Sequence, residues 1–166
     1  MSGRFRLVGA CLVLLLGGVG WLRALAYAPA GTDEQQIVAQ IQRAQRAAEM
    51  LSASGLMRVV SADYKDENGI TRPVLGYQTR DRLRTAQSLE ATIPMNRLQI
   101  RVDPGRKEAV SVVPLELRIT EKEGGAHTLT MNPTVNWRKE PTRRFLLFPV
   151  EEWRVVRVTG MESVAE

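Results

Sequence analysis

The segment from residue 61 to residue 69 holds the side chains best suited to chemistry. Asp63, Tyr64 and Asp66 place two carboxylates and a phenol within four positions. Such groups exchange protons with a substrate, or donate hydrogen bonds to it, when burial tunes their pKa values. A simpler interpretation exists, because Asp side chains also bond to the backbone around turns such as Asn68-Gly69. We expect this turn bonding from both aspartates, with Tyr64 packed under the rim of a sheet.

Metal and nucleophilic chemistry have little support in the rest of the sequence. The chain contains one histidine, His127, and one cysteine, Cys11. This composition excludes a disulfide framework and a multi-cysteine zinc site. Any Ser-His-Asp triad would have to use His127, which follows the turn Gly124-Gly125 and is expected to be exposed. The sequence also contains no Gly-x-Ser-x-Gly motif, which would mark a nucleophilic serine. We therefore expect no metal and no cofactor.

The first 26 residues have the pattern of an export signal. Arg4 and Arg6 precede an uncharged run over residues 7–22, and residues 24–26 read Ala-Leu-Ala, as at a signal-peptidase site. The run is shorter than the roughly 20 residues that span a bilayer. We expect cleavage after Ala26, with an uncleaved membrane anchor as the alternative. Either way the rest of the chain is exported, to the periplasm or outside the cell, free or tethered to the inner membrane by residues 7–22.

The basic character of the chain belongs largely to this leader. The whole sequence has a net charge of +5 and a pI near 9.9, which by itself favours a nucleic-acid partner. Arg4, Arg6 and Arg23 leave with the leader, so 20 basic and 18 acidic residues remain. The exported part is close to neutral, and we expect no nucleic acid as a partner and membrane contact only through an uncleaved leader.

A long amphipathic helix is predicted after a linker over residues 27–32. Thr32 and Gln35 form a capping box, and apolar residues then recur at helical spacing. These apolar residues are Ile37, Ile41, Ala44, Ala48 and Leu51. Gly55 is the predicted C-terminal cap.

Residues 56–79 are open to two interpretations. We favour one or two helical turns over residues 56–61 followed by a loop. The alternative is a β-hairpin around Asn68-Gly69 that pairs residues 57–64 with residues 73–79. Residues 79–88, which are rich in Arg and Leu, predict a further helix.

Apolar residues alternate with polar ones from Leu98 onward, which predicts a run of strands. The alternating segments are residues 98–102, 113–119, 129–137 and 153–158. Pro114 and Pro133 indicate edge positions or bulges, and Trp137 is expected to pack in the sheet or to line a ligand cavity. Helices followed by antiparallel strands predict an α+β domain over residues 33–166 with its helices on one face of the sheet.

This arrangement resembles the nuclear transport factor 2-like, or cystatin-like cone, superfamily, and in particular its exported bacterial members. The resemblance is carried by the long N-terminal helix, the Asp-Tyr-x-Asp segment at residues 63–66 and the closing strand Trp153–Val158. It implies a strongly bent antiparallel sheet wrapped on a long helix around a conical cavity. Some members are isomerases, cyclases or dehydratases, and others bind ligands or proteins, so the fold alone does not give the function.

Two functions are compatible with this resemblance. The first is an exported, non-catalytic domain of the cell envelope that binds a small apolar ligand or a protein partner, or forms a homodimer. Tyr64, Asp66 and Trp137 are its candidate ligand-binding residues. The alternative is a small isomerase or dehydratase in which Asp63 is the base and Tyr64 donates a hydrogen bond. We favour the first because the sequence has no convincing acid–base pair; a cavity filled by its own side chains would support it, whereas Asp63 buried in an open cavity would support the enzyme.

Overall fold

A computed structural model describes residues 31–103, 105–144 and 148–160. The predicted signal peptide, its anchor alternative and Cys11 lie outside these residues. No helix in the described part of the chain is long and apolar enough to cross a membrane. The chain divides into two compact units. The larger unit includes residues 31–140 and 152–160, which carry the helices and the candidate site, and the smaller one includes residues 141–151.

The predicted capping box begins the first described helix, α2 (Asp33–Glu49). The Thr32 hydroxyl accepts a hydrogen bond from the backbone N–H of Gln35, and the Gln35 side chain accepts one from the N–H of Thr32. Ile37 and Ile41 are buried, as their spacing predicts. The capping box and the apolar face of this helix are therefore confirmed.

The predicted cap at Gly55 is wrong. α2 ends at Glu49, and Leu51 turns the chain with a φ of 51°. Gly55 instead lies inside the short helix α3 (Ala53–Met57), whose N-cap Ser52 accepts a hydrogen bond from the Gly55 N–H. A Cβ at residue 55 would lie 2.8 Å from the Cβ of Ala47, so glycine is required here for the close approach of the two helices.

The segment between α3 and the first strand contains a longer helix than the sequence predicts. α4 (Arg72–Thr85) has a proline in its first turn, where proline is well tolerated. It is followed directly by the first strand, β1 (Ala86–Thr92), which begins within the segment predicted to be helical. The hairpin alternative reduces to one isolated bridge, Lys65 to Thr71, across the Asn68-Gly69 turn. The region therefore contains helix and loop and no hairpin, but the predicted helical turns over residues 56–61 end at Met57, and α4 occupies the last part of the predicted loop. The predicted helix over residues 79–88 is misplaced at both ends.

Six further strands follow a short 3-10 helix, η1 (Met95–Arg97). They are β2 (Gln99–Asp103), β3 (Glu108–Val112), β4 (Leu115–Glu121), β5 (Ala126–Met131), β6 (Thr134–Arg144) and β7 (Phe148–Thr159). They form one sheet of order β1-β4-β5 and a second of order β2-β3-β6-β7. The chain crosses between the sheets at Pro114, between β3 and β4, and at Pro133, between β5 and β6. The prolines interrupt the ladders there, so the predicted single strand over residues 129–137 is two strands.

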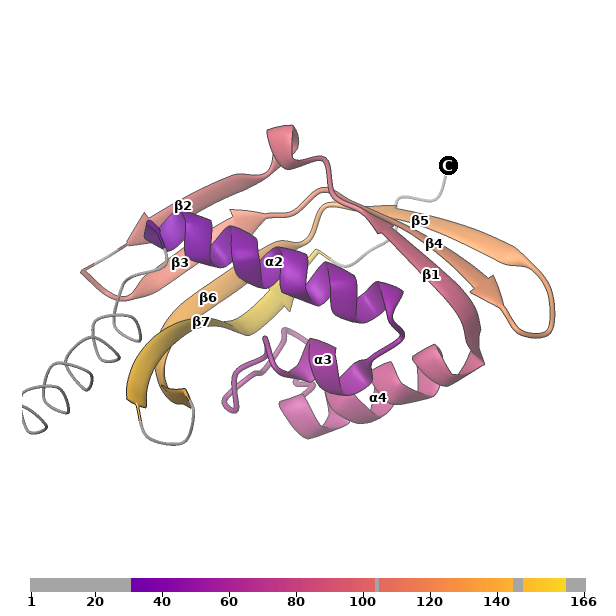
Figure 1. Ribbon diagram of the computed structural model, residues 1–166, viewed down its shortest axis with the longest axis horizontal. Helices are drawn as coiled ribbons and strands as arrows, with labels where there is room; N and C mark the ends of the chain where they lie inside the picture. Colours follow the sequence, from indigo (N-terminus) through magenta and orange to yellow (C-terminus); the bar gives the residue numbers. More distant parts are fainter. Residues whose placement is uncertain (1–30, 104, 145–147, 161–166) are drawn as a thin grey trace, which may run out of the picture. The chain divides into compact units, whose positions relative to one another are not determined.

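The core of the larger unit lies between α2 and the sheets. α2 runs across one side of both sheets, and α3 and α4 follow next to its C-terminal end (Figure 1). The buried cluster joins Ile37 and Ile41 of α2 to side chains from β3, β6, β7 and the segment after α3. Antiparallel strands bent into two sheets, with helices on one side, confirm the predicted α+β cone architecture.

Candidate functional site

Residues 61–65 run beside β7 with a turn at residues 62 and 63. The Ser61 N–H donates to the carbonyl of Val155 at 2.9 Å, and the Lys65 N–H donates to the carbonyl of Val156 at 3.1 Å. Tyr64 is buried in the core, on the inner face that α2 covers. Asp63 and Lys65 are exposed. Both lie on the opposite, outer face with Arg138, which follows the buried Trp137 on β6: the Asp63 carboxylate pairs with Arg138, and Lys65 borders the same groove.

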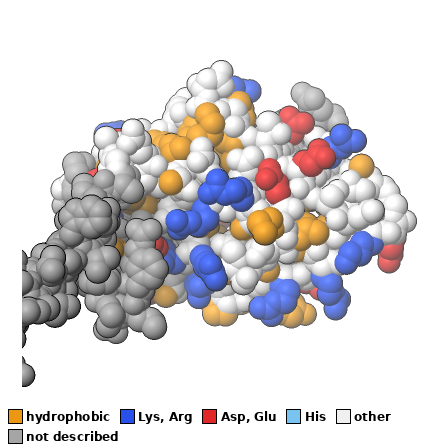
Figure 2. Space-filling view, viewed as in Figure 1, with side chains coloured by type: hydrophobic (Ala, Val, Ile, Leu, Met, Phe, Trp, Pro, Cys, Tyr) orange, Lys and Arg blue, Asp and Glu red, His pale blue; other side chains and the backbone are white. Residues whose placement is uncertain are grey.

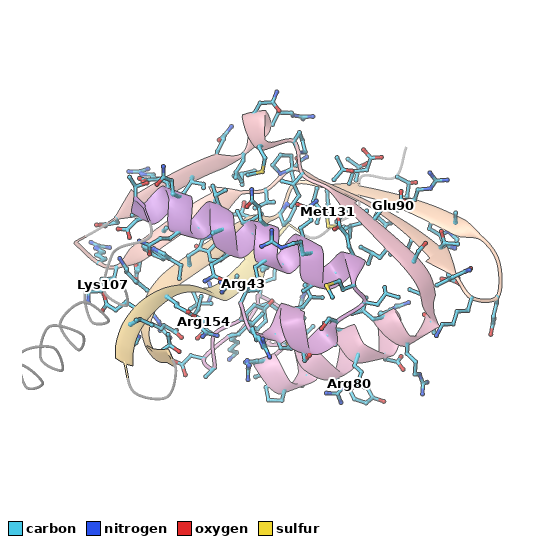
Figure 3. The ribbon with its side chains drawn as sticks, viewed as in Figure 1. Arg43, Arg80, Glu90, Lys107, Met131 and Arg154 are labelled. Atoms are coloured by element: carbon cyan, nitrogen blue, oxygen red, sulfur yellow. The ribbon has the colours of Figure 1, made fainter. Side chains whose placement is uncertain are left out.

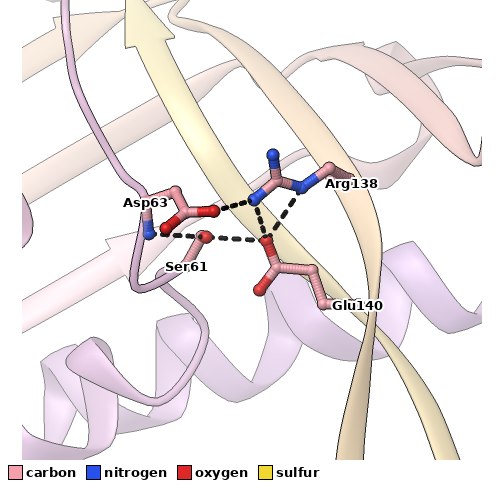
Figure 4. Close-up of polar contacts among 4 residues, drawn as sticks. All are labelled: Ser61, Asp63, Arg138 and Glu140. Carbon is pink, nitrogen blue, oxygen red and sulfur yellow. Dashed lines mark hydrogen bonds and ion pairs between the residues drawn. The ribbon is translucent and has the colours of Figure 1, made fainter.

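An arginine on β6 joins two carboxylates on this outer face (Figure 4). Arg138 Nη2 lies 2.7 Å from Asp63 Oδ2 and 2.6 Å from Glu140 Oε1, and Arg138 Nε donates to the same Glu140 oxygen at 3.0 Å. The Ser61 hydroxyl donates to Glu140 Oε1 at 2.7 Å and accepts from the Asp63 N–H at 3.0 Å. The hydrogen bonds to Glu140 and then to Asp63 raise the pKa of Arg138. The network therefore fixes the position of a charged guanidinium.

A groove of about 350 Å³ lies beside this network. Glu108 and Val110 of β3 stand opposite Arg138 and Asn136 of β6 in the antiparallel register. The side chains that give the groove its character are Lys65, Glu108, Val110, Asn136, Arg138 and Arg157. Ala109 and Trp137 also border it, although their side chains are buried in the core. Alternation along β3 and β6 thus assigns the groove to the outer face of the four-stranded sheet.

A second polar cluster ties the start of α2 to the inner face of the sheet. Lys139 Nζ lies 2.7 Å from Asp33 Oδ1, and Trp153 Nε1 donates to the same oxygen at 3.2 Å. The Lys139 ammonium also lies 5.7 Å from the centroid of the Trp153 ring. The hydrogen bond from Lys139 is the largest cause of the lowered pKa of Asp33, with burial acting in the opposite direction.

The helix-bearing side of the larger unit has a different character. Figure 2 shows basic side chains spread over much of it, with fewer acidic ones gathered toward one end and apolar ones between them. Arg43 of α2 and Arg80 of α4 are on this side (Figure 3). Basic side chains are therefore spread over this face, whereas Lys65, Arg138 and Arg157 border one groove on the outer face.

The residues singled out from the sequence do not share one cavity. Asp63 is exposed and paired with Arg138, whereas Tyr64 is only 3% exposed, and burial, followed by the charge of Asp66, raises its pKa. The Asp66 carboxylate accepts a hydrogen bond from the Ile70 N–H at 2.7 Å, so it brackets the turn as expected. The carboxylate of Asp63 does not bond to this turn, contrary to that expectation, because Arg138 holds it.

Trp137, the remaining candidate, belongs to the interior. Its side chain is 3% exposed, and its Nε1 donates to Ser111 Oγ at 2.8 Å. His127 is exposed, as expected. Within the ranges that the structure describes, no group of three or more His, Cys, Asp or Glu side chains is arranged to hold a metal ion.

Sequence reasoning missed most of the residues that line the groove. Lys65, Arg138 and Arg157 come from three separate segments, and nothing local in the sequence relates them. One signal was available: the alternation ending at Trp137, if extended along the same strand, assigns Arg138 and Glu140 to the face opposite that tryptophan.

Comparison with solved structures gives the same chain path in several bacterial proteins. A candidate scytalone dehydratase from Novosphingobium aromaticivorans has a TM-score of 0.63 at 12% identity, over 76% of this chain and 80% of that one. A candidate aromatic ring hydroxylase from the same organism has a TM-score of 0.61 at 13% identity, over 76% and 85%. An uncharacterised protein with a cystatin-like fold from Caulobacter vibrioides has a TM-score of 0.55 at 15% identity, over 77% and 87%. No protein-family model and no curated protein matches the sequence.

Proposed function

We propose that this chain, which has the nuclear transport factor 2-like, cystatin-like cone fold, is an exported, non-catalytic ligand-binding domain of the cell envelope. The ligand lies in the outer-face groove, between β3, β6, β7 and residues 63–65. The fold itself is compatible with ligand binding and with catalysis, so the placement of particular side chains has to support this choice.

The opposite orientation of Asp63 and Tyr64 carries the proposal. A base and a hydrogen-bond donor act together only when both reach the same reacting atoms. Here the carboxylate of Asp63 is 74% exposed and bonded to Arg138, while Tyr64 packs among Ile37, Ile41 and other apolar side chains. The two groups therefore lie on opposite faces of the sheet and do not form an acid–base pair.

The dimensions of the groove fit a small molecule. Small-molecule sites commonly have volumes of about 300–1,000 Å³ and combine apolar walls with a few polar groups. The groove, at about 350 Å³, lies at the lower end of this range, and it presents Val110 and Val156 alongside Asn136 and charged side chains. A compact organic ligand matches this size and lining.

Export is supported by the leader pattern of the first 26 residues. An alkaline phosphatase fusion at the C-terminus of the full chain is expected to be active, because that reporter needs an oxidising compartment to form its disulfides. Substituting two residues of the uncharged run, Leu14→Arg and Leu15→Arg, should abolish the reporter activity. Equal activity of the fusion and of this variant would contradict export.

Binding in the groove is tested by NMR with the full chain in a mild non-ionic detergent. A library of small organic molecules is screened, and shifts of the backbone amide signals locate each binder. We expect the shifts to centre on β3, β6 and residues 63–65, and Val110→Trp, which fills the groove, to remove them. Val74→Trp is the matched control, because Val74 on α4 has a similar exposure to that of Val110, 46% against 41%. Shifts centred on the inner-face residues Tyr64, Ile41 and Trp137 would instead favour the enzymatic alternative and overturn the proposal.

A further inference from the structure

The groove offers more unpaired hydrogen-bond donors than acceptors. On the basis of the function proposed above, we propose that it binds the oxyanion of a small organic molecule, that is, a carboxylate or phosphate group. The oxyanion is held by Arg138, Lys65 and Arg157.

Arg138 presents a preorganised donor. Its Nε and Nη2 atoms are occupied by Glu140 and Asp63, whereas Nη1 has no hydrogen-bond partner among the described residues (Figure 4). A guanidinium already fixed by two carboxylates loses little further freedom when it binds a ligand, and the N–H groups of its free Nη1 can donate to an oxyanion oxygen. The network in Figure 4 therefore positions Arg138 as a binding residue.

Lys65 and Arg157 add two cations at the same place. The hydrogen bond from the Lys65 N–H to the carbonyl of Val156 brings residue 65 next to residues 156 and 157, which are distant in the sequence. Both side chains are exposed and border the groove, and neither forms an ion pair within the described part of the chain. Neighbouring like charges repel, so an anion bound between them gains from both and also relieves that repulsion.

The remaining lining determines what else the ligand can be. Asp63 is neutralised by Arg138, which leaves Glu108 as the one lining carboxylate without an ion-pair partner among the described residues. Arg138 is already balanced by Asp63 and Glu140, so the unpaired charges of the lining are two cations, Lys65 and Arg157, against this single carboxylate, and they favour a ligand with a negative charge. Asn136 can donate one more hydrogen bond, and Val110 and Val156 offer apolar contact to the carbon skeleton of the ligand.

Isothermal titration calorimetry on the full chain in non-ionic detergent, at constant ionic strength, tests this inference. The probes are inorganic phosphate, succinate and the neutral analogue succinamide. We expect phosphate or succinate to bind and succinamide not to. Lys65→Gln and Arg157→Gln should each weaken binding by about tenfold, the usual effect of losing one charged hydrogen-bond donor. Arg80→Gln, which removes an equivalent exposed charge from α4, should leave the affinity unchanged.

The outcomes separate the two oxyanion sources and the two proposals. Binding of phosphate alone identifies a phosphate ligand, and binding of succinate alone identifies a carboxylate. If neither binds while a neutral library molecule shifts the groove amides, the oxyanion inference is overturned and the binding function stands. An equal loss in Arg80→Gln would reveal general charge attraction and would also overturn the inference. Library molecules that shift only inner-face amides overturn the proposed function itself.

Discussion

Substituting Asp33 with Asn tests how the first turn of α2 is held to the sheet. The carboxylate has two charged hydrogen bonds, from Lys139 Nζ at 2.7 Å and Trp153 Nε1 at 3.2 Å. Hydrogen bonds to charged groups contribute about 1.5–3 kcal/mol when buried, but exposed ion pairs contribute less than about 1 kcal/mol. Asp33 and Lys139 are 27% and 21% exposed. We therefore expect Asp33→Asn to lower the free energy of unfolding by about 1–2 kcal/mol at neutral pH.

The loss of stability in Asp33→Asn should become smaller as the pH falls. The fold lowers the pKa of Asp33 from its ordinary value of 3.8. Its contribution to stability is therefore fully present above 3.8 and disappears as the pH falls through the lower value of the folded state. The difference between wild type and Asp33→Asn should be constant from pH 7 to pH 5, and should shrink toward zero once Asp33 is protonated in the wild type.

Urea denaturation followed by tryptophan fluorescence measures this difference. Glu34→Gln is the matched control, because Glu34 lies in the same helical turn but is exposed and forms no ion pair in the part of the chain that the structure describes. The free energy of unfolding of Glu34→Gln should fall by no more than the contribution of a charge at the helix dipole, about 0.3–1 kcal/mol. Two results would refute the reasoning: an equal loss of unfolding free energy in both variants, or a loss in Asp33→Asn that stays the same at acid pH. A double-mutant cycle with Lys139→Met isolates the pair itself.

Three further substitutions test the core. Ser111→Ala leaves the Trp137 Nε1–H without its acceptor in the interior, so urea denaturation should show a loss of about 1–3 kcal/mol. Gly55→Ala places a Cβ 2.8 Å from that of Ala47, and it should lower the stability by about 1–3 kcal/mol in thermal unfolding, although alanine is the better helix former. Burial raises the pKa of Tyr64 above its ordinary 10.0. In a spectrophotometric titration the Tyr64 phenol should therefore ionise after exposed tyrosines, and Tyr64→Phe should remove this late phase. The contribution of the neutral phenol to stability is present below pH 10.0 and is lost as the pH rises through the folded-state pKa of Tyr64.

Each of these results has a clear opposite. A Ser111→Ala variant as stable as wild type would mean that the Trp137 indole finds another acceptor. A gain in stability for Gly55→Ala would mean that α2 and α3 separate at little cost. A late ionisation phase that persists in Tyr64→Phe would assign that phase to a different tyrosine.

The sequence alone was sufficient for the features that depend on local periodicity. The spacing of Ile37 and Ile41 predicts the buried face of α2, and the Thr32–Gln35 pair predicts its first residue, because capping and amphipathicity act within one or two turns. The alternation from Leu98 onward likewise predicts strands. Trp137 and Trp153 are buried as that alternation indicates.

Local patterns failed where contacts from elsewhere decided the conformation. Gly55 resembles a helix cap, but its role depends on the approach of Ala47, which no local rule contains. β1 carries no clear alternation of its own. It is extended because it pairs with β4, whose residues lie about 30 positions later.

The sequence determined that residues 63–66 carry an Asp-Tyr-x-Asp segment on a polar turn, but not which face each side chain would occupy. Backbone hydrogen bonds from Ser61 and Lys65 to β7 decided that. Because these two bonds anchor the chain on either side of a turn at residues 62 and 63, Tyr64 is directed into the core and Asp63 toward Arg138, a residue 75 positions away. The groove with Lys65, Arg138 and Arg157 exists only in the tertiary structure, since charges from three separate segments become neighbours only when strands pair.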